Sequence, residues 1–394
     1  MNITCRLTLK SALKWSIVFC VAGMFLYVIK NDPSAMNFEQ EKLSLSLHLE
    51  NGYVDSTTTQ AAYNYSEGTD IILLAYMRSG STFLGNLLGW RPDVFYWFEP
   101  LRNLRLWDYI RDFDLLCNVV QPSCNIIPET DARSLQNALS LLDDILHCRL
   151  AHRVNESTDL NYSPEQASPS WQRHLNCTAV NNGSKLHPKC VSYLEEDCHK
   201  ASHRMVKALR IDLNSVSLLL HNNPRLKIVH LLRDPRGIIN SRLRTFWYAA
   251  FLKTDAAISD DIQVICSRLR NNIESGIRLL KIYPNRVKLI QYEDGFNVKS
   301  PKISKLYEFL NIDEPKDIHA NEIDKLSSTY YANRTDGFNP FLYRQQLPWN
   351  VVAMVNNHCA DVMSNMGLRM FRSEAELRNE SIPVIYSKLT YTIL

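Results

Sequence analysis

A short polar run, Arg78-Ser79-Gly80-Ser81-Thr82, separates two apolar segments of the chain. The residues before it, 71–77, are almost all apolar, which predicts a strand buried on both faces. Apolar side chains then recur at helical spacing from Phe83 to Leu88. A glycine turn between a strand and a helix directs backbone N–H groups and the helix dipole toward one point, where Arg78 adds a full positive charge. The pattern predicts an anion-binding loop; the alternative is an ordinary turn with a Ser or Thr cap.

This loop does not have the sequence of a Walker-type nucleoside triphosphate loop. That loop carries a lysine directly after its last glycine, and the lysine reaches the terminal phosphates. Gly80 stands alone here, Ser81 follows it in place of lysine, and the cation Arg78 precedes it. A membrane-tethered nucleotide kinase is therefore disfavoured.

A second candidate for phosphate binding follows the predicted strand 226–232. The strand ends at Arg233, and Pro235 suits the first turn of a helix that continues to Leu243. The guanidinium of Arg233 and the hydroxyl of Ser241 are suitable donors to one phosphate group. The alternative is that these side chains are only solvated or ion-paired.

Together the two segments resemble the signatures of sulfotransferases that use 3′-phosphoadenosine 5′-phosphosulfate (PAPS). Residues 78–84 are similar to the 5′-phosphosulfate loop, and residues 233–242 are similar to the 3′-phosphate element. Arginine at the start of the loop, followed by P-D-V-F-Y-W-F-E-P at 92–100, resembles the Golgi carbohydrate 6-O-sulfotransferases. The resemblance covers about 70–372 apart from an insert, and it reappears at 207–210, 291–294, 306–310 and 359–367.

The resemblance implies a reaction, a donor and a set of site residues. It implies transfer of a sulfuryl group from PAPS to the 6-hydroxyl of galactose, N-acetylglucosamine or N-acetylgalactosamine, and it implies no metal. A chondroitin- or keratan sulfate-type acceptor is favoured, although the sequence does not name the acceptor. The implied donor-binding residues are Arg78, Ser79, Gly80, Ser81, Thr82, Phe83, Arg233 and Ser241. Arg78 would also neutralise charge on the leaving phosphate.

Glu99 is the candidate base for the acceptor hydroxyl. It follows an aromatic, strand-like segment at 94–97, and a carboxyl group among aromatic side chains is expected to have a raised pKa. The alternative is a structural carboxylate paired with Arg102 or Arg105. His230 is a weaker candidate, because a histidine inside an apolar strand is more often a core residue.

Two further interpretations concern the acceptor. The arginines Arg236, Arg242 and Arg244 are expected to line an approach for an anionic glycan, unless they form only a solvated helix face. A glycan-binding protein that has the fold without catalysis is the alternative function. Such a protein would be expected to lack Arg233, Ser241 or an intact loop, and all are present.

An uncharged apolar segment at 15–29 predicts a retained membrane anchor. Because Arg6, Lys10 and Lys14 precede it, the positive-inside rule places residues 1–14 in the cytosol and the rest of the chain in the lumen. The alternative is a cleaved signal peptide. The polar segment 30–68 is expected to be a luminal stem, and the resemblance implies a single-pass type II protein of the Golgi membrane.

Eight of the ten cysteines follow the anchor, an even number that predicts disulfides in an oxidising compartment, with the connectivity open. Their spacing does not suit a zinc site. N-glycosylation sequons are dense between 155 and 184, which indicates an exposed, cysteine-rich insert at about 151–200.

Alternating strand and helix patterns between 69 and 372 predict one α/β catalytic domain, with a C-terminal tail at 373–394. The expected fold is P-loop-like, a mostly parallel sheet with helices on both faces. Further elements are expected as strands at 205–209 and 287–291 and as helices at 133–150, 262–283 and 348–366. Ligands bind at the carboxyl ends of such strands, so one nucleotide is expected to lie across both motifs. The modest net charge of +3 and the lack of a recognised module disfavour a nucleic-acid partner.

Overall fold

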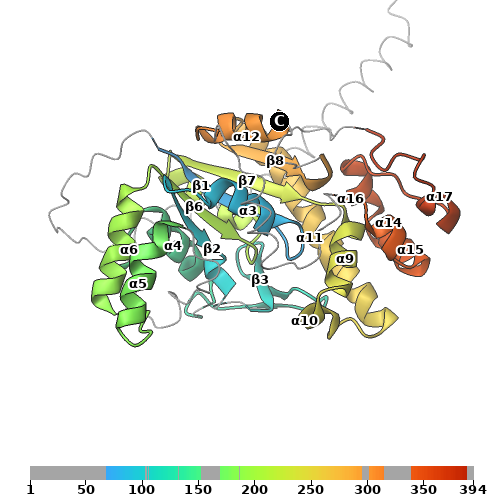
Figure 1. Cartoon of the computed structure of the whole chain (residues 1–394). Helices are drawn as coiled ribbons and strands as arrows, with labels where there is room; N and C mark the ends of the chain where they lie inside the picture. The colour runs from blue at the N-terminus through green and yellow to red at the C-terminus, as the bar shows by residue number, and fades with distance from the viewer. Residues whose placement is uncertain are drawn as a thin grey trace, which may run out of the picture. The chain divides into compact units, whose positions relative to one another are not determined.

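The computed structural model describes residues 68–102, 104, 106–131, 133–151, 169–185, 187–294, 301–314 and 339–387. These residues are built around a five-stranded sheet in the order β2-β6-β1-β7-β8, and every neighbouring pair is parallel (Figure 1). Its strands are β1 (Asp70–Leu74), β2 (Val94–Phe98), β6 (His203–Ala208), β7 (Leu226–Leu232) and β8 (Val287–Gln291). The prediction of a mostly parallel α/β sheet is confirmed.

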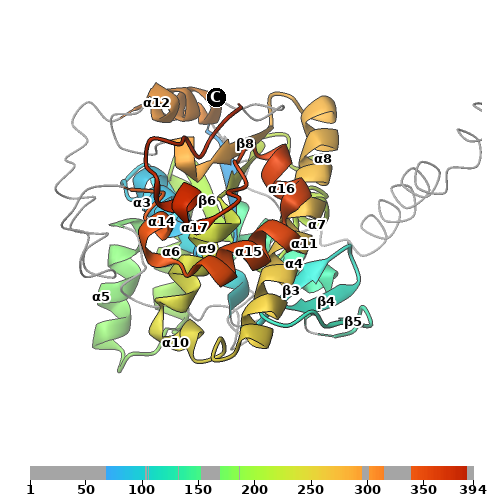
Figure 2. The same cartoon turned by 90° about the vertical axis from the view of Figure 1, so that its right-hand side faces the viewer.

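The central strand β1 is apolar along its whole length because helices cover both of its faces. Ile72 and Leu74 join a cluster with α4 (Leu135–Leu146) and α11 (Asp255–Ile282). Ile71 and Leu73 join a second cluster with α3 (Ser81–Gly89) and α12 (Pro301–Leu310). Figure 2 shows α3 and α12 on one side of the sheet and α4 and α11 on the other.

Element boundaries follow local capping and covalent signals. The predicted strands 226–232 and 287–291 agree with β7 and β8. α11 begins at Asp255, well before the predicted start at 262, because the hydroxyl of Thr254 accepts a hydrogen bond from the N–H of Ala257. The predicted helix 348–366 is divided at Cys359 into α15 (Trp349–His358) and α16 (Ala360–Asn365).

The other α-helices of the described residues are α5 (Gln172–Val180), α6 (Pro188–Lys200), α7 (Leu213–Val216), α8 (Leu219–Asn222), α9 (Pro235–Leu243), α10 (Phe246–Ala249), α14 (Tyr343–Gln346) and α17 (Glu374–Arg378).

A small antiparallel sheet, which the sequence patterns did not predict, lies between β2 and α4 in the chain. It consists of β3 (Asp108–Arg111), β4 (Leu115–Asn118) and β5 (Cys124–Ile126). Its strands are too short to show a clear alternation of side chains. The disulfide Cys117–Cys124 joins β4 to β5 at residues that face each other across the pair.

All eight cysteines after the predicted anchor form disulfides, which confirms that prediction. Besides Cys117–Cys124, the pairs are Cys148–Cys198, Cys177–Cys190 and Cys266–Cys359. Cys177–Cys190 joins α5 to α6 in the described part of the predicted insert.

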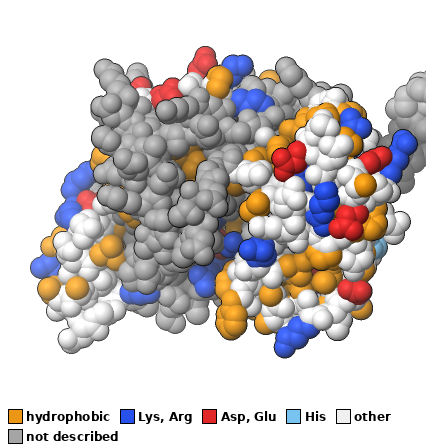
Figure 3. Space-filling model, turned by 45° about the vertical axis from the view of Figure 1, so that its right-hand side comes forward, with side chains coloured by type: hydrophobic (Ala, Val, Ile, Leu, Met, Phe, Trp, Pro, Cys, Tyr) orange, Lys and Arg blue, Asp and Glu red, His pale blue; other side chains and the backbone are white. Residues whose placement is uncertain are grey.

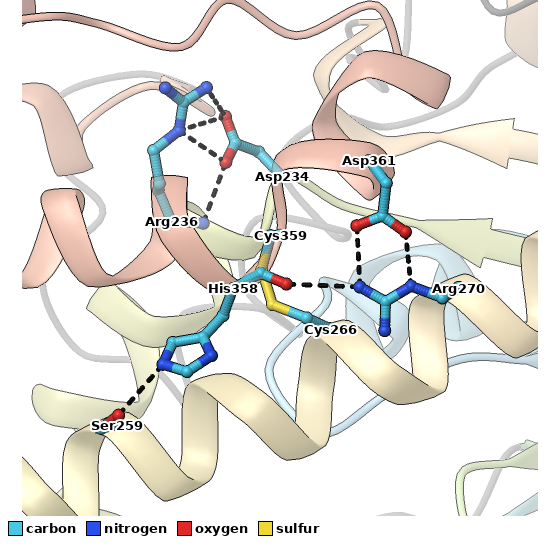
Figure 4. Close-up of a disulfide and its surroundings, with 8 residues drawn as sticks. All are labelled: Asp234, Arg236, Ser259, Cys266, Arg270, His358, Cys359 and Asp361. Atoms are coloured by element: carbon cyan, nitrogen blue, oxygen red, sulfur yellow. Dashed lines mark hydrogen bonds and ion pairs between the residues drawn. A yellow bond between two sulfur atoms is a disulfide. The ribbon is translucent and has the colours of Figure 1, made fainter.

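The disulfide Cys266–Cys359 attaches the C-terminal helices to α11 (Figure 4). On either side of it, Arg270 pairs with Asp361, and Ser259 hydrogen-bonds to His358 over 3.1 Å. This covalent link closes a long loop, since 93 residues separate the two cysteines.

The predicted cytosolic tail, anchor and nearly all of the stem, residues 1–67, lie outside the described residues. In the part of the chain that is described, no helix is long and apolar enough to cross a membrane. Residues 373–387, within the predicted C-terminal tail, include α17, and the carbonyl of Leu377 accepts a hydrogen bond from Arg344 of α14.

The loop lengths lead to a stability prediction. Replacing Cys266 and Cys359 by alanine should lower the free energy of unfolding by roughly 4 kcal/mol, since a disulfide that closes a long loop restricts the unfolded chain most. Replacing Cys117 and Cys124, which are only 7 residues apart, should lower it by about 2 kcal/mol in the same chain-entropy treatment. Urea unfolding of both double variants under oxidising conditions measures the two losses. An equal or larger loss for the short loop would contradict the expectation.

Candidate active site

The loop after β1 is a tight turn closed by its own serine. The N–H and the hydroxyl of Ser79 both donate to the carbonyl of Tyr76, over 3.1 and 2.8 Å. Arg78 and Gly80 on either side have φ values of 73° and 91°, in the left-handed region. A Cβ at position 80 would lie 2.2 Å from the ring of Tyr292, so this position requires glycine for two reasons. Ser79 therefore shapes the turn with both of its donors.

Helix α3 starts directly after this turn without a capping side chain. Its N-cap residue is Gly80, and no side-chain cap hydrogen bond is made there. Helices α4, α11 and α17, by contrast, are capped by Ser134, Thr254 and Ser373. An uncapped helix start presents backbone N–H groups and the positive end of the helix dipole to an anion. The predicted loop residues Ser81, Thr82 and Phe83 form this first turn.

The second motif lies against the first, although 155 residues separate Arg233 from Arg78 in the chain. Arg233, which follows β7, donates from Nη1 to the carbonyl of Arg78 over 2.8 Å. Arg78 in turn donates from Nε to the hydroxyl of Ser241 over 3.0 Å. The Arg233 guanidinium lies over the ring of Tyr292, 4.4 Å from its centroid, and its Nε has no hydrogen-bond partner among the described residues. The predicted residues Arg78, Arg233 and Ser241 thus form one cluster.

The cluster lies where the winding of the sheet changes direction. From β1 the chain passes through α3 toward β2 at one edge, whereas from β7 it passes through α9 and α11 to β8 at the other. The loops after the neighbouring strands β1 and β7 therefore diverge, and such a switch point is where ligands bind in open α/β sheets.

Glu99, the candidate base, follows β2 and lies in a buried ion pair. Oε1 accepts a hydrogen bond from Lys207 Nζ over 2.9 Å, and Oε2 accepts one from Arg210 Nη1 over 2.8 Å. Burial acts to raise the pKa of Glu99, but the two cations outweigh it and hold the pKa at about 2. The expectation of a raised pKa is wrong, because aromatic neighbours alone do not set the local charge. The alternative partners were Arg102, which is exposed, and Arg105, which lies outside the described residues.

Lys207 links the candidate base to the predicted anion-binding loop. Its Nζ donates to the hydroxyl of Thr82 over 3.1 Å as well as to Glu99, and it lies 3.7 Å from the centroid of the Phe98 ring. Burial lowers the pKa of Lys207, and the negative charge of Glu99 acts in the opposite direction. No role was predicted for Lys207 or Arg210 from the sequence. The sequence signal that was available is a lysine inside the predicted strand 205–209. The structure shows that every residue of the corresponding strand β6 is buried, where an unpaired lysine is rare.

Residues 68–346 match the sulfotransferase domain family. The matched range contains the loop after β1, the element after β7 and the Glu99 ion pair. The chain belongs to the sulfotransferase family.

Relatives of this sulfotransferase are similar over most of their length. Carbohydrate sulfotransferase 1 of Danio rerio is 28% identical over 358 residues, which cover 83% of this chain and 84% of the relative. The Rattus norvegicus protein of that name is 26% identical over 363 residues, covering 82% and 85%. Carbohydrate sulfotransferase 6 of Homo sapiens is 25% identical over 350 residues, covering 80% and 84%. Among solved structures, a sulfotransferase from Mycobacterium avium is 12% identical with a TM-score of 0.35 over 77% of this chain and 78% of that one, too low to carry an argument.

His230 is a core residue of this sulfotransferase. It is fully buried in β7, and its Nε2 lies 2.9 Å from the hydroxyl of Tyr76, which also accepts a hydrogen bond from Asn272. Burial, with a smaller effect of Arg268, lowers the pKa of His230 to about 3, so the ring is neutral at physiological pH. This agrees with its position as the weaker candidate base.

Two arginines expected to line a glycan approach are instead buried. Arg236 is fully buried and pairs with Asp234 over 2.7 Å, and Arg242 pairs with Asp261. The expectation is wrong for these two residues, because both guanidinium groups form buried ion pairs and do not reach the surface. Only Arg244, at the end of α9, is exposed.

A second carboxyl group supports the start of α9. Glu293, just after β8, accepts a hydrogen bond at Oε1 from the N–H of Asp234 over 2.8 Å. Burial, together with the nearby charge of Asp234, raises the pKa of Glu293 to about 8. Burial and the charge of Asp234 thus favour the protonated form of Glu293, which offsets less of the positive charge of the neighbouring Arg233 than an ionised carboxylate would.

One group of metal-ligating side chains occurs among the described residues. Ligand atoms of Cys177, His187 and Cys190 lie within 4.8 Å of one another. The two cysteines form a disulfide, so they cannot act as the thiolate ligands that a metal ion requires.

The buried ion pair leads to a pH-dependent prediction. Glu99→Gln should lower the free energy of unfolding by roughly 3 kcal/mol at pH 7, since two buried cations would lose their counter-charge. A carboxylate with a lowered pKa stabilises the fold above its unfolded pKa, and this stabilisation is lost as the pH falls through about 2. The difference between wild type and variant should therefore shrink from about pH 4.5 downward.

Urea unfolding between pH 7 and pH 3 measures this difference. Glu374→Gln is the matched control, because Glu374 pairs with Arg378 on the surface, where an ion pair contributes less than about 1 kcal/mol. A loss for Glu99→Gln that stays constant across this pH range would show that the ionised carboxylate is not its cause.

Proposed function

We propose that this sulfotransferase moves a sulfuryl group from PAPS to the 6-hydroxyl of a galactose or N-acetylhexosamine residue in a glycosaminoglycan or glycoprotein chain. The observation that carries the proposal is the contact of Lys207 with both Thr82 and Glu99. It joins an anion-binding loop to an ionised carboxylate in one buried network. Transfer between a bound anion and a hydroxyl requires this kind of fixed positioning.

The donor would bind across the loops after β1 and β7. The backbone amides in the first turn of α3 and the guanidinium of Arg78 suit the 5′-phosphosulfate, while Arg233 and Ser241 suit the 3′-phosphate. Gly237 leaves room for this arrangement, since a Cβ there would lie 3.0 Å from Arg233 Nε. The proposed donor-binding set is Arg78, Ser79, Gly80, Ser81, Thr82, Phe83, Arg233 and Ser241, with Ser79 contributing through the shape of the turn.

In the proposed reaction, the bond between sulfur and the bridging phosphate oxygen breaks as a bond to the acceptor oxygen forms. The phosphate leaves with the electron pair of the broken bond, and Arg78 and Lys207 offset its charge. The acceptor hydroxyl loses its proton to Glu99. A sulfate group near Lys207 would compete with Glu99 for the lysine charge, which would raise the pKa of Glu99 toward that of a useful base.

The acceptor class is inferred from relatives and from motifs. Relatives that are 25–28% identical to this chain are named carbohydrate sulfotransferases, which supports a sugar acceptor. The 6-hydroxyl and the preference for a chondroitin- or keratan sulfate-type chain rest on the resemblance of residues 78–83 and 92–100 to 6-O-sulfotransferases.

We also propose that the enzyme is a single-pass type II protein of the Golgi membrane, anchored by residues 15–29. The disulfides among residues 117–359 support an oxidising, luminal environment for the catalytic domain. A tag placed before Met1 should be digested by protease added to intact Golgi vesicles; protection of the tag would contradict this orientation.

Two arginine variants separate donor binding from turnover. Arg233→Ala should weaken PAPS binding by about 1.5–3 kcal/mol, the contribution of a hydrogen bond to a charged group. Arg78→Ala should chiefly lower kcat, because charge on the leaving phosphate develops only as the bond breaks. Calorimetric titration of PAPS and initial-rate kinetics measure the two effects.

Arg278→Ala, which removes an exposed arginine on α11, is the matched control and should leave both quantities unchanged. Unchanged donor affinity in Arg233→Ala would exclude Arg233 from the phosphate site. Normal turnover in Arg78→Ala would exclude Arg78 from the proposed chemistry.

The reaction itself is tested with labelled PAPS and a panel of desulfated glycans, followed by disaccharide analysis of the product. We expect label at the 6-position of galactose or an N-acetylhexosamine. Sulfate at O4 or at nitrogen would refute the regiochemistry but not the use of PAPS. Glycan binding without any transfer would instead favour the non-catalytic alternative.

A further inference from the structure

Aromatic side chains, two of them exposed and one half-buried, gather beside the proposed active site. We call Trp107, Trp247 and Phe251 the aromatic platform. The Trp107 ring centroid lies 4.7 Å from that of Phe251 and 5.9 Å from that of Trp247. Trp247 is 47% exposed and Phe251 is 49% exposed, and the neighbouring Phe246 is 93% exposed. Figure 3 shows hydrophobic side chains gathered at the lower edge of the described surface.

The aromatic platform rests on a rigid base. Tyr248 is fully buried beneath it, with ring centroids 5.9 Å from Trp107 and 5.5 Å from Trp247. Its hydroxyl donates to Asp261 over 3.0 Å. Contiguous exposed apolar surface is unusual on a soluble domain and marks a binding site when it is held in place.

Two separate contacts tie the platform to the proposed catalytic residues. On one side, Arg210 pairs with Glu99 and donates from Nε to the carbonyl of Leu106, the residue before Trp107. The other contact lies on α9, where the hydroxyl of Ser241 accepts a hydrogen bond from Nε of Arg78. The platform is therefore continuous with the site on the Glu99 side.

The contact on α9 leads directly into the helix that carries Trp247. The carbonyl of Ser241 accepts a hydrogen bond from the hydroxyl of Thr245 over 2.7 Å, and Thr245 is the N-cap residue of α10. Two residues, Ser241 and Thr245, thus connect Arg78 of the proposed donor loop to the start of α10. Both ends of the platform are anchored by residues that also hold the proposed catalytic groups.

Exposed cations bracket the platform along the chain. Arg244 precedes α10 and Lys253 follows Phe251, and both are exposed. Neither forms an ion pair with another described residue. An apolar aromatic surface between two cations suits a ligand that has an apolar face and carries anionic groups.

We propose that the aromatic platform binds a sugar ring of the acceptor chain at a position beyond the sugar that is sulfated. This inference rests on the proposed function and adds a subsite to it. One face of a pyranose ring presents C–H groups that pack on an aromatic ring, while its hydroxyl groups stay in water. Arg244 and Lys253 would attract carboxylate or sulfate groups of neighbouring sugars. Long anionic acceptors should therefore bind more tightly than a disaccharide.

The test compares the full-length wild type with Trp247→Ala, using a desulfated chondroitin disaccharide and the corresponding hexasaccharide, which keep their anionic carboxylate groups. Binding is measured by calorimetry in the presence of adenosine 3′,5′-bisphosphate, and KM and kcat are measured with PAPS. We expect Trp247→Ala to weaken hexasaccharide binding and raise its KM by roughly three- to tenfold. The disaccharide KM, the kcat and the affinity for PAPS should be unchanged, and Trp247→Phe should recover most of the loss.

Ile282→Ala is the matched control, because Ile282 has a similar exposed fraction of 46% at the end of α11 that leads into the amino end of β8. Equal hexasaccharide affinity in wild type and Trp247→Ala would overturn the subsite, as would an equal loss for both acceptor lengths. Reduced binding of Trp247→Ala to phosphatidylserine-containing vesicles with unchanged hexasaccharide affinity would assign the platform to a membrane surface and also overturn it. A wild type that binds the hexasaccharide but transfers no sulfate would contradict the proposed function alone.

Discussion

The arrangement of the site depends on one buried carboxylate, Glu99, shared by Lys207 and Arg210. The ion pair requires the parallel register of β2 and β6, in which Phe98 lies opposite Lys207. Glu99 then follows β2 at the level of Lys207, and its N–H donates to the Lys207 carbonyl over 3.1 Å. Because Lys207 also contacts Thr82, the same register sets the position of the candidate base relative to the donor loop. Buried charges demand such complete pairing, since an unpaired one is strongly destabilising.

Both proposed catalytic residues are among the seven non-glycine residues with positive φ in the described part of the chain. Arg78 and Glu99 both have positive φ values, 73° and 48°, which are unfavourable for residues other than glycine. Such conformations cost about 1–3 kcal/mol each and persist only where surrounding contacts enforce them. Here the enforcing contacts are the hydrogen bond from Arg233 to the Arg78 carbonyl and the ion pair of Glu99. The fold thus holds both side chains in place before any substrate binds.

The C-terminal helices support the proposed 3′-phosphate element from outside the two motifs. Asp234 accepts hydrogen bonds from Arg236 and, over 2.8 Å, from the hydroxyl of Tyr343 on α14. Arg236 also donates to the carbonyl of Arg369. The disulfide that joins α11 to α16 keeps this segment against the domain. Arg233 can therefore turn toward the proposed donor site, because the charges next to it are already satisfied within the fold.

The sequence by itself determined many of the local elements of this protein, although not the small antiparallel sheet. An apolar run, a lone glycine and a following helix specify the turn at Gly80, and Pro235 specifies the start of α9, because these preferences act between neighbours in the chain. The parallel α/β sheet and the disulfides of the eight cysteines after residue 29 followed from patterns of the same kind. The two motifs were expected at strand ends, and parallel strands bring their carboxyl ends to one edge.

Only the tertiary structure decided which charges meet. Glu99 finds its partners 108 and 111 residues away, and this reversed the expected direction of its pKa shift. The same applies to Arg236 and Arg242, whose burial removed them from the expected glycan approach. The aromatic platform joins Trp107 to Trp247 from segments with no common pattern. The pKa of a group and the exposure of a side chain depend on the atoms within a few ångströms of it. Most of these atoms belong to residues that are distant in the chain.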